Sequence, residues 1–145
     1  MRKTSTRGRR PLTKAQLLPL PADQVRRLSL KHHLALAVLR DGRGDLEAIG
    51  TLLNVLYLAY FLHGADDPDS ACYRLAEAAL DQCVARAERG ASWTVTAGER
   101  AALEPLVLIH DGQLAAVPLH RYLDAWERVQ CVTAPGGHSP IRAAA

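Results

Sequence analysis

Aromatic side chains are scarce in this sequence. Phenylalanine, tyrosine and tryptophan together make up 5% of the 145 residues, and methionine occurs once. Apolar residues still account for 48%, so the core must be built mainly from leucine, alanine and valine. A composition led by leucine and alanine favours helices. The basic segment at the start also lacks the interleaved aromatic rings on which single-stranded bases would stack.

Paired cysteines and long apolar runs are missing as well. The three cysteines are an odd number and form no CxxC motif, which indicates neither a disulfide framework nor a structural zinc site. We therefore expect a reducing compartment and place the protein in the cytoplasm. The longest apolar stretch, Ile49 to Leu62, has 14 residues, fewer than the roughly 18 to 20 that cross a bilayer. We expect no membrane association.

Negative charge is nearly absent from the first 31 residues. They hold nine basic residues and a single acid, Asp23, which gives a net charge of +8. Residues 32–145 hold the other nine basic residues and fourteen acids, a net charge of −5. A cationic segment ahead of a mildly acidic body is typical of chains that meet phosphates or an acidic protein surface.

The order of proline, glycine and capping residues predicts one all-α domain, a single compact bundle of about five helices over residues 21–130. Residues 1–20 are expected to form a disordered basic arm and linker, because Pro11, Pro19 and the following Pro21 block a continuous helix. Residues 131–145, rich in proline, glycine and alanine, are expected to form a short disordered tail. The predicted helices are 23–40, 45–63, 67–89, 96–116 and 118–130.

The second predicted helix is apolar on nearly every side. One of its seams contains Leu53, Leu56 and Tyr60. Such a helix must be enclosed by other helices or by a second subunit, and we predict a homodimer. Asn54 lies within the same apolar run, where an enclosed amide needs partners and commonly fixes the register of a helical interface.

No motif in the sequence fixes a reaction. Glycine-rich phosphate loops, GxSxG and paired carboxylates are absent, so we predict no enzyme, no cofactor and no metal. The pair His110-Asp111 is similar to the ligands of HD-type phosphohydrolases, with His33 or His63 and Asp124 as candidates for further ligands. Helical spacing points the two side chains to different sides, which favours a packed core histidine. A metal-dependent hydrolase using His110 and Asp111 is the third-ranked alternative.

The basic segment therefore carries the functional prediction. A cationic chain of this kind can neutralise several phosphates. With about five such contacts, raising the salt concentration from 50 to 200 mM would lower the binding affinity by roughly 10² to 10³. We predict a non-enzymatic regulator or accessory protein that contacts nucleic acid, most simply duplex DNA. No helix-turn-helix spacing is found. The predicted contact residues are Arg2, Lys3, Arg7, Arg9, Arg10 and Lys14 of the arm, helped by Arg26, Arg27 and Lys31.

Two other interpretations of the same features stay open. In the first, the chain is a helical protein–protein interaction module, an adaptor or inhibitor with no nucleic-acid role, and Asp66, Asp67 and Asp69 form one contact. An acidic protein surface would then meet the arm. In the second, the arm is only a solvated tail that aids solubility.

The stretches RRLSLKHHLALAVLR and LVLIHDGQLAAVPLHRYLDAW, behind a basic start, resemble a group of small proteobacterial proteins. Some of these are labelled Fis-type transcriptional regulators and occur with accessory or mobile DNA. The resemblance spans roughly residues 20–130 and implies a regulatory or accessory role in bacteria. Fis proteins carry a C-terminal helix-turn-helix rich in arginine and lysine, whereas residues 96–130 hold three arginines and no lysine, so no Fis residue is transferred.

Overall fold

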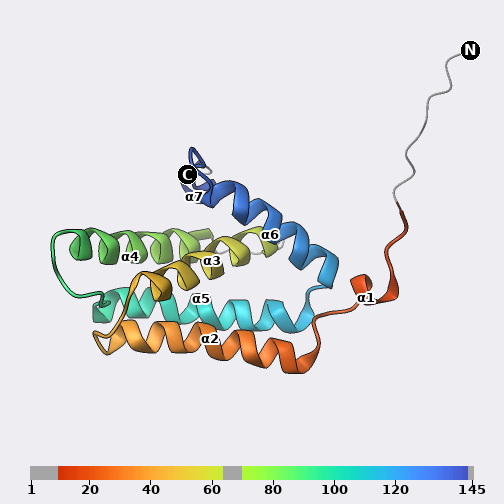
Figure 1. The fold of residues 1–145 in the computed structure, drawn as a ribbon, viewed down its shortest axis with the longest axis horizontal. Helices are drawn as coiled ribbons and strands as arrows, with labels where there is room; N and C mark the ends of the chain where they lie inside the picture. The colour runs from red at the N-terminus through yellow and green to blue at the C-terminus, as the bar shows by residue number, and fades with distance from the viewer. Residues whose placement is uncertain (1–9, 64–69, 144–145) are drawn as a thin grey trace, which may run out of the picture.

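The computed structural model describes residues 10–63 and 70–143. Within these residues the chain is all-α, and the only β feature is an isolated bridge between Pro19 and Pro118. The described residues form seven helices, where the sequence predicted about five: five long helices and two helices of four residues, one near each end of the chain (Figure 1). The helices are α1 (Lys14–Leu17), α2 (Ala22–Arg40), α3 (Leu46–Leu62), α4 (Ser70–Glu88), α5 (Ala97–Ala116), α6 (Leu119–Thr133) and α7 (Pro140–Ala143).

The predicted start signals are confirmed at two long helices. The Asp45 carboxylate accepts a hydrogen bond from the backbone N–H of Ala48 at 2.8 Å and caps α3. Thr96 and Glu99 form a reciprocal capping box at the start of α5. Helix α2 continues through Ser29 without a break. The predicted start of the third helix, at Asp67, lies outside the described residues.

Helix α3 is the centre of the bundle. It contacts α2, α4, α5 and α6, while α2 and α4 each also contact α5 (Figure 1). Most of the apolar side chains of α3 are therefore covered by other helices of the same chain, which is one of the two solutions that its composition requires, although Leu46 is 69% exposed and Leu53 is half-buried. The homodimer stays a prediction, and the enclosure of α3 no longer needs it. The buried α3 side chains are those of Ala48, Ile49, Leu52, Val55, Leu56, Leu58, Ala59 and Leu62.

The apolar interior has two parts. The larger part joins α2, α3, α4 and α5, and the smaller part joins the C-terminal half of α3 to α6 and the linker. Tyr122 and Val129 of α6 are buried in the smaller part, together with Leu20 from the linker. No helix among the described residues is long and apolar enough to span a membrane.

The C-terminal segment corrects the prediction of a disordered tail for residues 131–143, and residues 144–145 lie outside the described residues. Residues 131–133 belong to α6, and Ile141 on α7 is 3% exposed within the larger core. Glu77 on α4 is also buried, and its carboxylate accepts hydrogen bonds from Ser139 and Arg142. A buried carboxylate needs donors, and an apolar side chain gains by leaving water, so this segment packs despite its composition.

The linker also departs from the prediction for residues 1–20. Residues 14–17 form α1, which contacts α6, and the backbone N–H of Leu119 donates to the carbonyl of Leu18 at 2.8 Å. Leu20 is 7% exposed, so burial of its side chain holds this part of the chain on the bundle. Residues 1–9 of the predicted disordered arm lie outside the described residues.

Candidate functional site

The predicted cationic residues that the structure describes all lie at the surface. Arg10, Lys14, Arg26, Arg27 and Lys31 are exposed. Arg27 pairs with a carboxylate one turn earlier on α2, at 3.3 Å, in a solvated position. The other four form no ion pair with any carboxylate among residues 10–63 and 70–143. Their charge is available to a partner. The remaining arm residues, Arg2, Lys3, Arg7 and Arg9, lie outside the described residues.

Two leucines lie between these cations on the outer face of α2. Leu30 is 59% exposed and Leu34 is 54% exposed, one turn apart and flanked by Arg26, Arg27 and Lys31. Neither leucine was singled out from the sequence, although their i, i+4 spacing was visible there. These two side chains leave apolar surface in water beside the cations of α2.

A cluster of polar side chains joins α2 to α5 in the interior. His110 is fully buried, and its Nδ1 lies 3.0 Å from the Oε1 atom of Gln113. The amide nitrogen of Gln113 donates to the carbonyl of Ala59 at 3.0 Å, so Gln113 must accept from His110, which places the imidazole proton on Nδ1. The unprotonated Nε2 of His110 and the Nδ1 of His32 are buried without a hydrogen-bond partner among the described residues.

Burial controls the charge of these two histidines. Burial is the main cause, and the neighbouring His110 the second, of a lowering of the His32 pKa from 6.5 to about 4. Burial also lowers the pKa of His110, and this outweighs the hydrogen bond to Gln113, which acts in the opposite direction. Both rings are therefore neutral near pH 7. The prediction that His110 is a packed core histidine agrees with this placement.

Asp111 faces away from His110, as its helical position predicts. Its carboxylate accepts a hydrogen bond from Ser29 at 2.7 Å and lies 2.7 Å from the Nε2 atom of His33. Ser29 and His33 thus share one carboxylate, and no hydrogen bond joins the serine to the histidine. A nucleophilic triad needs the histidine to contact the hydroxyl, so this arrangement orders side chains between α2 and α5 and does not activate Ser29.

The other candidates for metal ligation lie in different surroundings. His63, at the end of α3, contacts the backbone carbonyl of Tyr60, and its ring packs at a tilt against the rings of Tyr60 and Tyr73. Asp124 is exposed on α6, beside Arg121 and Arg128. Within residues 10–63 and 70–143 no three His, Cys, Asp or Glu side chains form a group that could hold a metal ion.

The residues predicted to set a helical register on α3 divide between core and edge. Leu56 is fully buried in the larger core, whereas Leu53 and Asn54 are half-buried. Tyr60 is half-buried and its hydroxyl donates to the carbonyl of Pro140 at 3.4 Å, so it contacts the C-terminal segment of its own chain. The Asn54 amide forms no hydrogen bond with another described residue.

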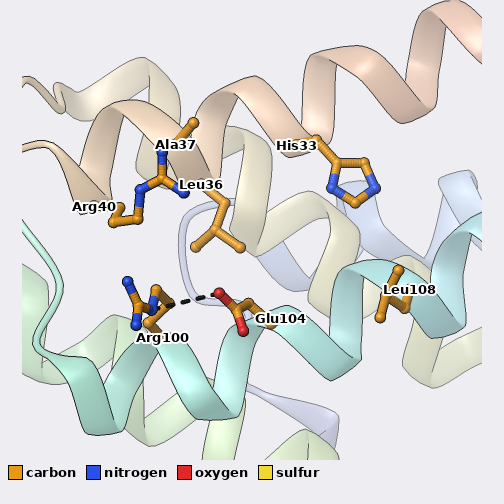
Figure 2. A pocket seen from close by; sticks show the side chains of 7 residues that line it. All are labelled: His33, Leu36, Ala37, Arg40, Arg100, Glu104 and Leu108. Carbon is orange, nitrogen blue, oxygen red and sulfur yellow. Dashed lines mark ion pairs between the residues drawn. The ribbon is translucent and has the colours of Figure 1, made fainter.

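A groove lies between α2 and α5 on the surface (Figure 2). It encloses about 250 Å³, and Leu36 points into it from α2. Arg40 and Arg100 lie at one end, on opposite helices, and Leu108 lies toward the other end. None of these residues was singled out from the sequence, because the groove exists only where two antiparallel helices meet.

Comparison with known proteins assigns neither a family nor a function to this chain. No protein-family model matches the sequence, and no curated protein or solved structure gives a significant match.

Proposed function

We propose that this chain is a non-enzymatic, cytoplasmic regulator or accessory protein that contacts duplex DNA through basic residues at its N-terminus. The observation that carries the proposal is the separation of charge, +8 over residues 1–31 against −5 over the remainder. Arg10, Lys14, Arg26 and Lys31 are exposed and unpaired among the described residues, which supports a role for this charge outside the protein.

The physical basis is release of counterions from the phosphate backbone. Each lysine or arginine that neutralises a phosphate frees a condensed cation, which gives affinity without sequence specificity and a steep dependence on salt. Backbone contacts position a protein on DNA but do not select a base sequence. The chain would then be an accessory protein, or a regulator that acts by covering DNA without reading its base sequence. This is the kind of role implied by the resemblance to the bacterial proteins labelled Fis-type regulators. A homodimer would double the number of phosphate contacts.

The test is a DNA-binding titration with a fluorescent random duplex at 50 and 200 mM salt. In the arm variant, Arg2, Lys3, Arg7, Arg9, Arg10 and Lys14 are all replaced by glutamine in the full-length chain. We expect the wild-type affinity to fall by about 10² to 10³ over this salt range, and the arm variant to lose most of the affinity and of the salt dependence. An arm variant that binds like the wild type would overturn the proposal.

A matched pair of variants tests the contribution of the folded domain. The α2 variant replaces Arg26, Arg27 and Lys31 with glutamine, and the control replaces three exposed arginines elsewhere, Arg74, Arg89 and Arg121. Both sets remove three positive charges. We expect only the α2 variant to reduce the salt slope, by about one unit, because the arm makes most of the phosphate contacts. Equal losses would mean that net charge matters and location does not.

The second candidate function is a helical protein–protein interaction module, an adaptor or inhibitor. The observation that favours it is the exposed pair Leu30 and Leu34 among cations, because DNA phosphates offer no apolar surface to cover these leucines. An acidic protein with an apolar face would cover them. Replacing both leucines with serine separates the candidates, since DNA binding should persist while binding to such a protein should be lost.

A further inference from the structure

A second groove, between α2 and the first half of α3, is apolar in its middle. It encloses about 200 Å³, and Leu34 and Val38 of α2 line it together with Thr51 of α3. Leu30 lies one turn before Leu34 and continues the apolar strip along α2. Leu30 is 59% exposed and Leu34 is 54% exposed. This surface, here called the α2/α3 face, therefore leaves apolar side chains in water.

Opposite charges lie at the two ends of the α2/α3 face. Helices α2 and α3 run antiparallel, so the start of α3 lies beside the end of α2 (Figure 1). Asp45 and Glu47 line the groove at that end, whereas Lys31 lines it toward the start of α2. Lys31 and Glu47 form no ion pair within residues 10–63 and 70–143. Both charges can therefore be used across an interface.

This arrangement of charge limits what can cover the α2/α3 face. Duplex DNA would be repelled by Asp45 and Glu47 and would leave Leu34 in water. A uniformly acidic protein would meet the same two carboxylates. The α2/α3 face of a second copy, turned end for end, presents a lysine to each Glu47, a glutamate to each Lys31 and a leucine to each leucine. The face is thus complementary to itself in one orientation.

We propose that two copies of this chain pair through the α2/α3 face about a two-fold axis that passes near Leu34. Lys31 of each copy contacts Glu47 of the other copy, and the two leucine strips are buried between them. A two-fold interface contains every contact twice, so this one kind of ion pair is made at both ends. Burial of the leucines supplies the affinity. The charges fix the orientation, because the reverse alignment would place like charges together.

This interface differs from the one expected from the sequence. The seam of Leu53, Leu56 and Tyr60 is used within the chain, since Leu56 is fully buried in the core and Tyr60 contacts Pro140. The inference rests on the proposed function only in that a homodimer doubles its phosphate contacts, and pairing itself needs no DNA. An ammonium has three donors, so Lys31 can contact a carboxylate and a phosphate together.

The test is sedimentation equilibrium of the purified full-length chain, without DNA, over a range of protein concentrations. We expect the mass to rise reversibly from 15.8 kDa to twice that value and no further. Leu34→Ser should weaken the association by about tenfold or more, because it removes apolar surface from the centre of the interface. Leu75→Ser, at a position on α4 that is 62% exposed, is the matched control and should leave the association unchanged.

Charge reversal then identifies the ion pair. Lys31→Glu and Glu47→Lys should each stay monomeric alone, because each would bring like charges together across the interface. An equimolar mixture of these two variants should form a heterodimer, since both of its ion pairs again join opposite charges. Glu127→Lys, at an exposed position on α6, is the control and should not restore association when mixed with Lys31→Glu. Circular dichroism checks that each variant is folded.

Three outcomes overturn the proposal. A chain that stays at 15.8 kDa at every concentration does not pair, which leaves this face to a different protein. A mass that grows beyond two copies indicates head-to-tail association. A dimer that withstands Leu34→Ser and the charge reversals forms through another surface. Failure of the proposed function is a separate result, because a dimer that does not bind DNA would overturn only the DNA contact.

Discussion

The imidazole rings of His32 and His110 lie with their centroids 5.3 Å apart, tilted by 40°, between α2 and α5. Each ring has one buried nitrogen without a hydrogen-bond partner among the described residues. Two neutral rings can lie together in this way, but a proton on either would place a charge in a poorly solvated site beside its neighbour. The folded state therefore resists protonation at this position.

This resistance predicts that the protein loses stability in mild acid. Below pH 6.5 an unfolded chain protonates His32, whereas the folded chain, with a pKa of about 4, does not. The unfolded state then binds more protons, and the free energy of unfolding falls as the pH falls from 6.5 toward 4. We expect a loss of about 2 kcal/mol from His32 between about pH 7 and pH 5 in urea denaturation. His110 should add to this loss.

His32→Leu should remove most of that part of the pH dependence, because leucine has no group to protonate. His138→Gln is the matched control, since His138 is exposed in the C-terminal segment. It should leave the loss in acid unchanged. If the His32 variant loses as much stability in acid as the wild type, protonation of His32 is not the cause of the acid sensitivity.

A second prediction concerns the ion pair of Arg86 and Glu99, which joins the end of α4 to the start of α5. Arg86 binds both carboxylate oxygens, and the side chains are 27% and 11% exposed. Burial raises the pKa of Glu99, but hydrogen bonds from Arg86 and the Thr96 backbone outweigh it, so the pKa lies below its ordinary value. The pair therefore stabilises the fold at neutral pH, and this stabilisation is lost as acid protonates Glu99.

Glu99→Gln should destabilise the protein by about 2 kcal/mol at pH 7, because it leaves the partly buried Arg86 without its counter-charge. Glutamine can still accept the N-cap hydrogen bond, so the capping box is kept. Glu104→Gln is the control on the same helix. Its pair with Arg100 is about half exposed, and the change should be within about 0.5 kcal/mol. Equal effects at the two positions would contradict this explanation.

A third prediction tests the packing of the C-terminal segment. Ile141→Ala should lower the free energy of unfolding by about 2 to 4 kcal/mol, because the side chain is 3% exposed within the larger core. Leu75→Ala, at a position that is 62% exposed, should change it by less than about 0.5 kcal/mol. Chemical denaturation measures both. A flexible tail would make Ile141→Ala as mild as Leu75→Ala.

A fourth prediction contrasts two glycines. A Cβ atom at Gly44 would lie 2.3 Å from Cδ2 of the buried Leu39 and 2.7 Å from the carbonyl oxygen of Trp93. Gly44→Ala should therefore destabilise the protein by more than about 1 kcal/mol. A Cβ at Gly50, inside α3, would meet nothing within 4 Å. Gly50→Ala should stabilise it by about 0.5 to 1 kcal/mol through helix propensity, as thermal unfolding would show. Two changes of the same sign would refute this account.

The sequence by itself determined, through local signals, where two of the long helices begin. Asp45 and the Thr96–Glu99 capping box act within one turn of the chain, so the sequence alone predicted the starts of two long helices. The opposite directions of His110 and Asp111 also followed from helical spacing. The charge separation needs no fold at all, because it is a property of composition.

Only the tertiary structure decided which helices meet. Glu77 and Arg142 are 65 residues apart, and the groove joins α2 to α5, so no local pattern could predict either contact. The prediction that the C-terminal segment is disordered was wrong for the same reason. Its composition is typical of disorder, but Ile141 packs into a space formed by distant residues. Capping and periodicity are settled by neighbours in the chain. Packing is settled by the volume and charge that remote segments bring together.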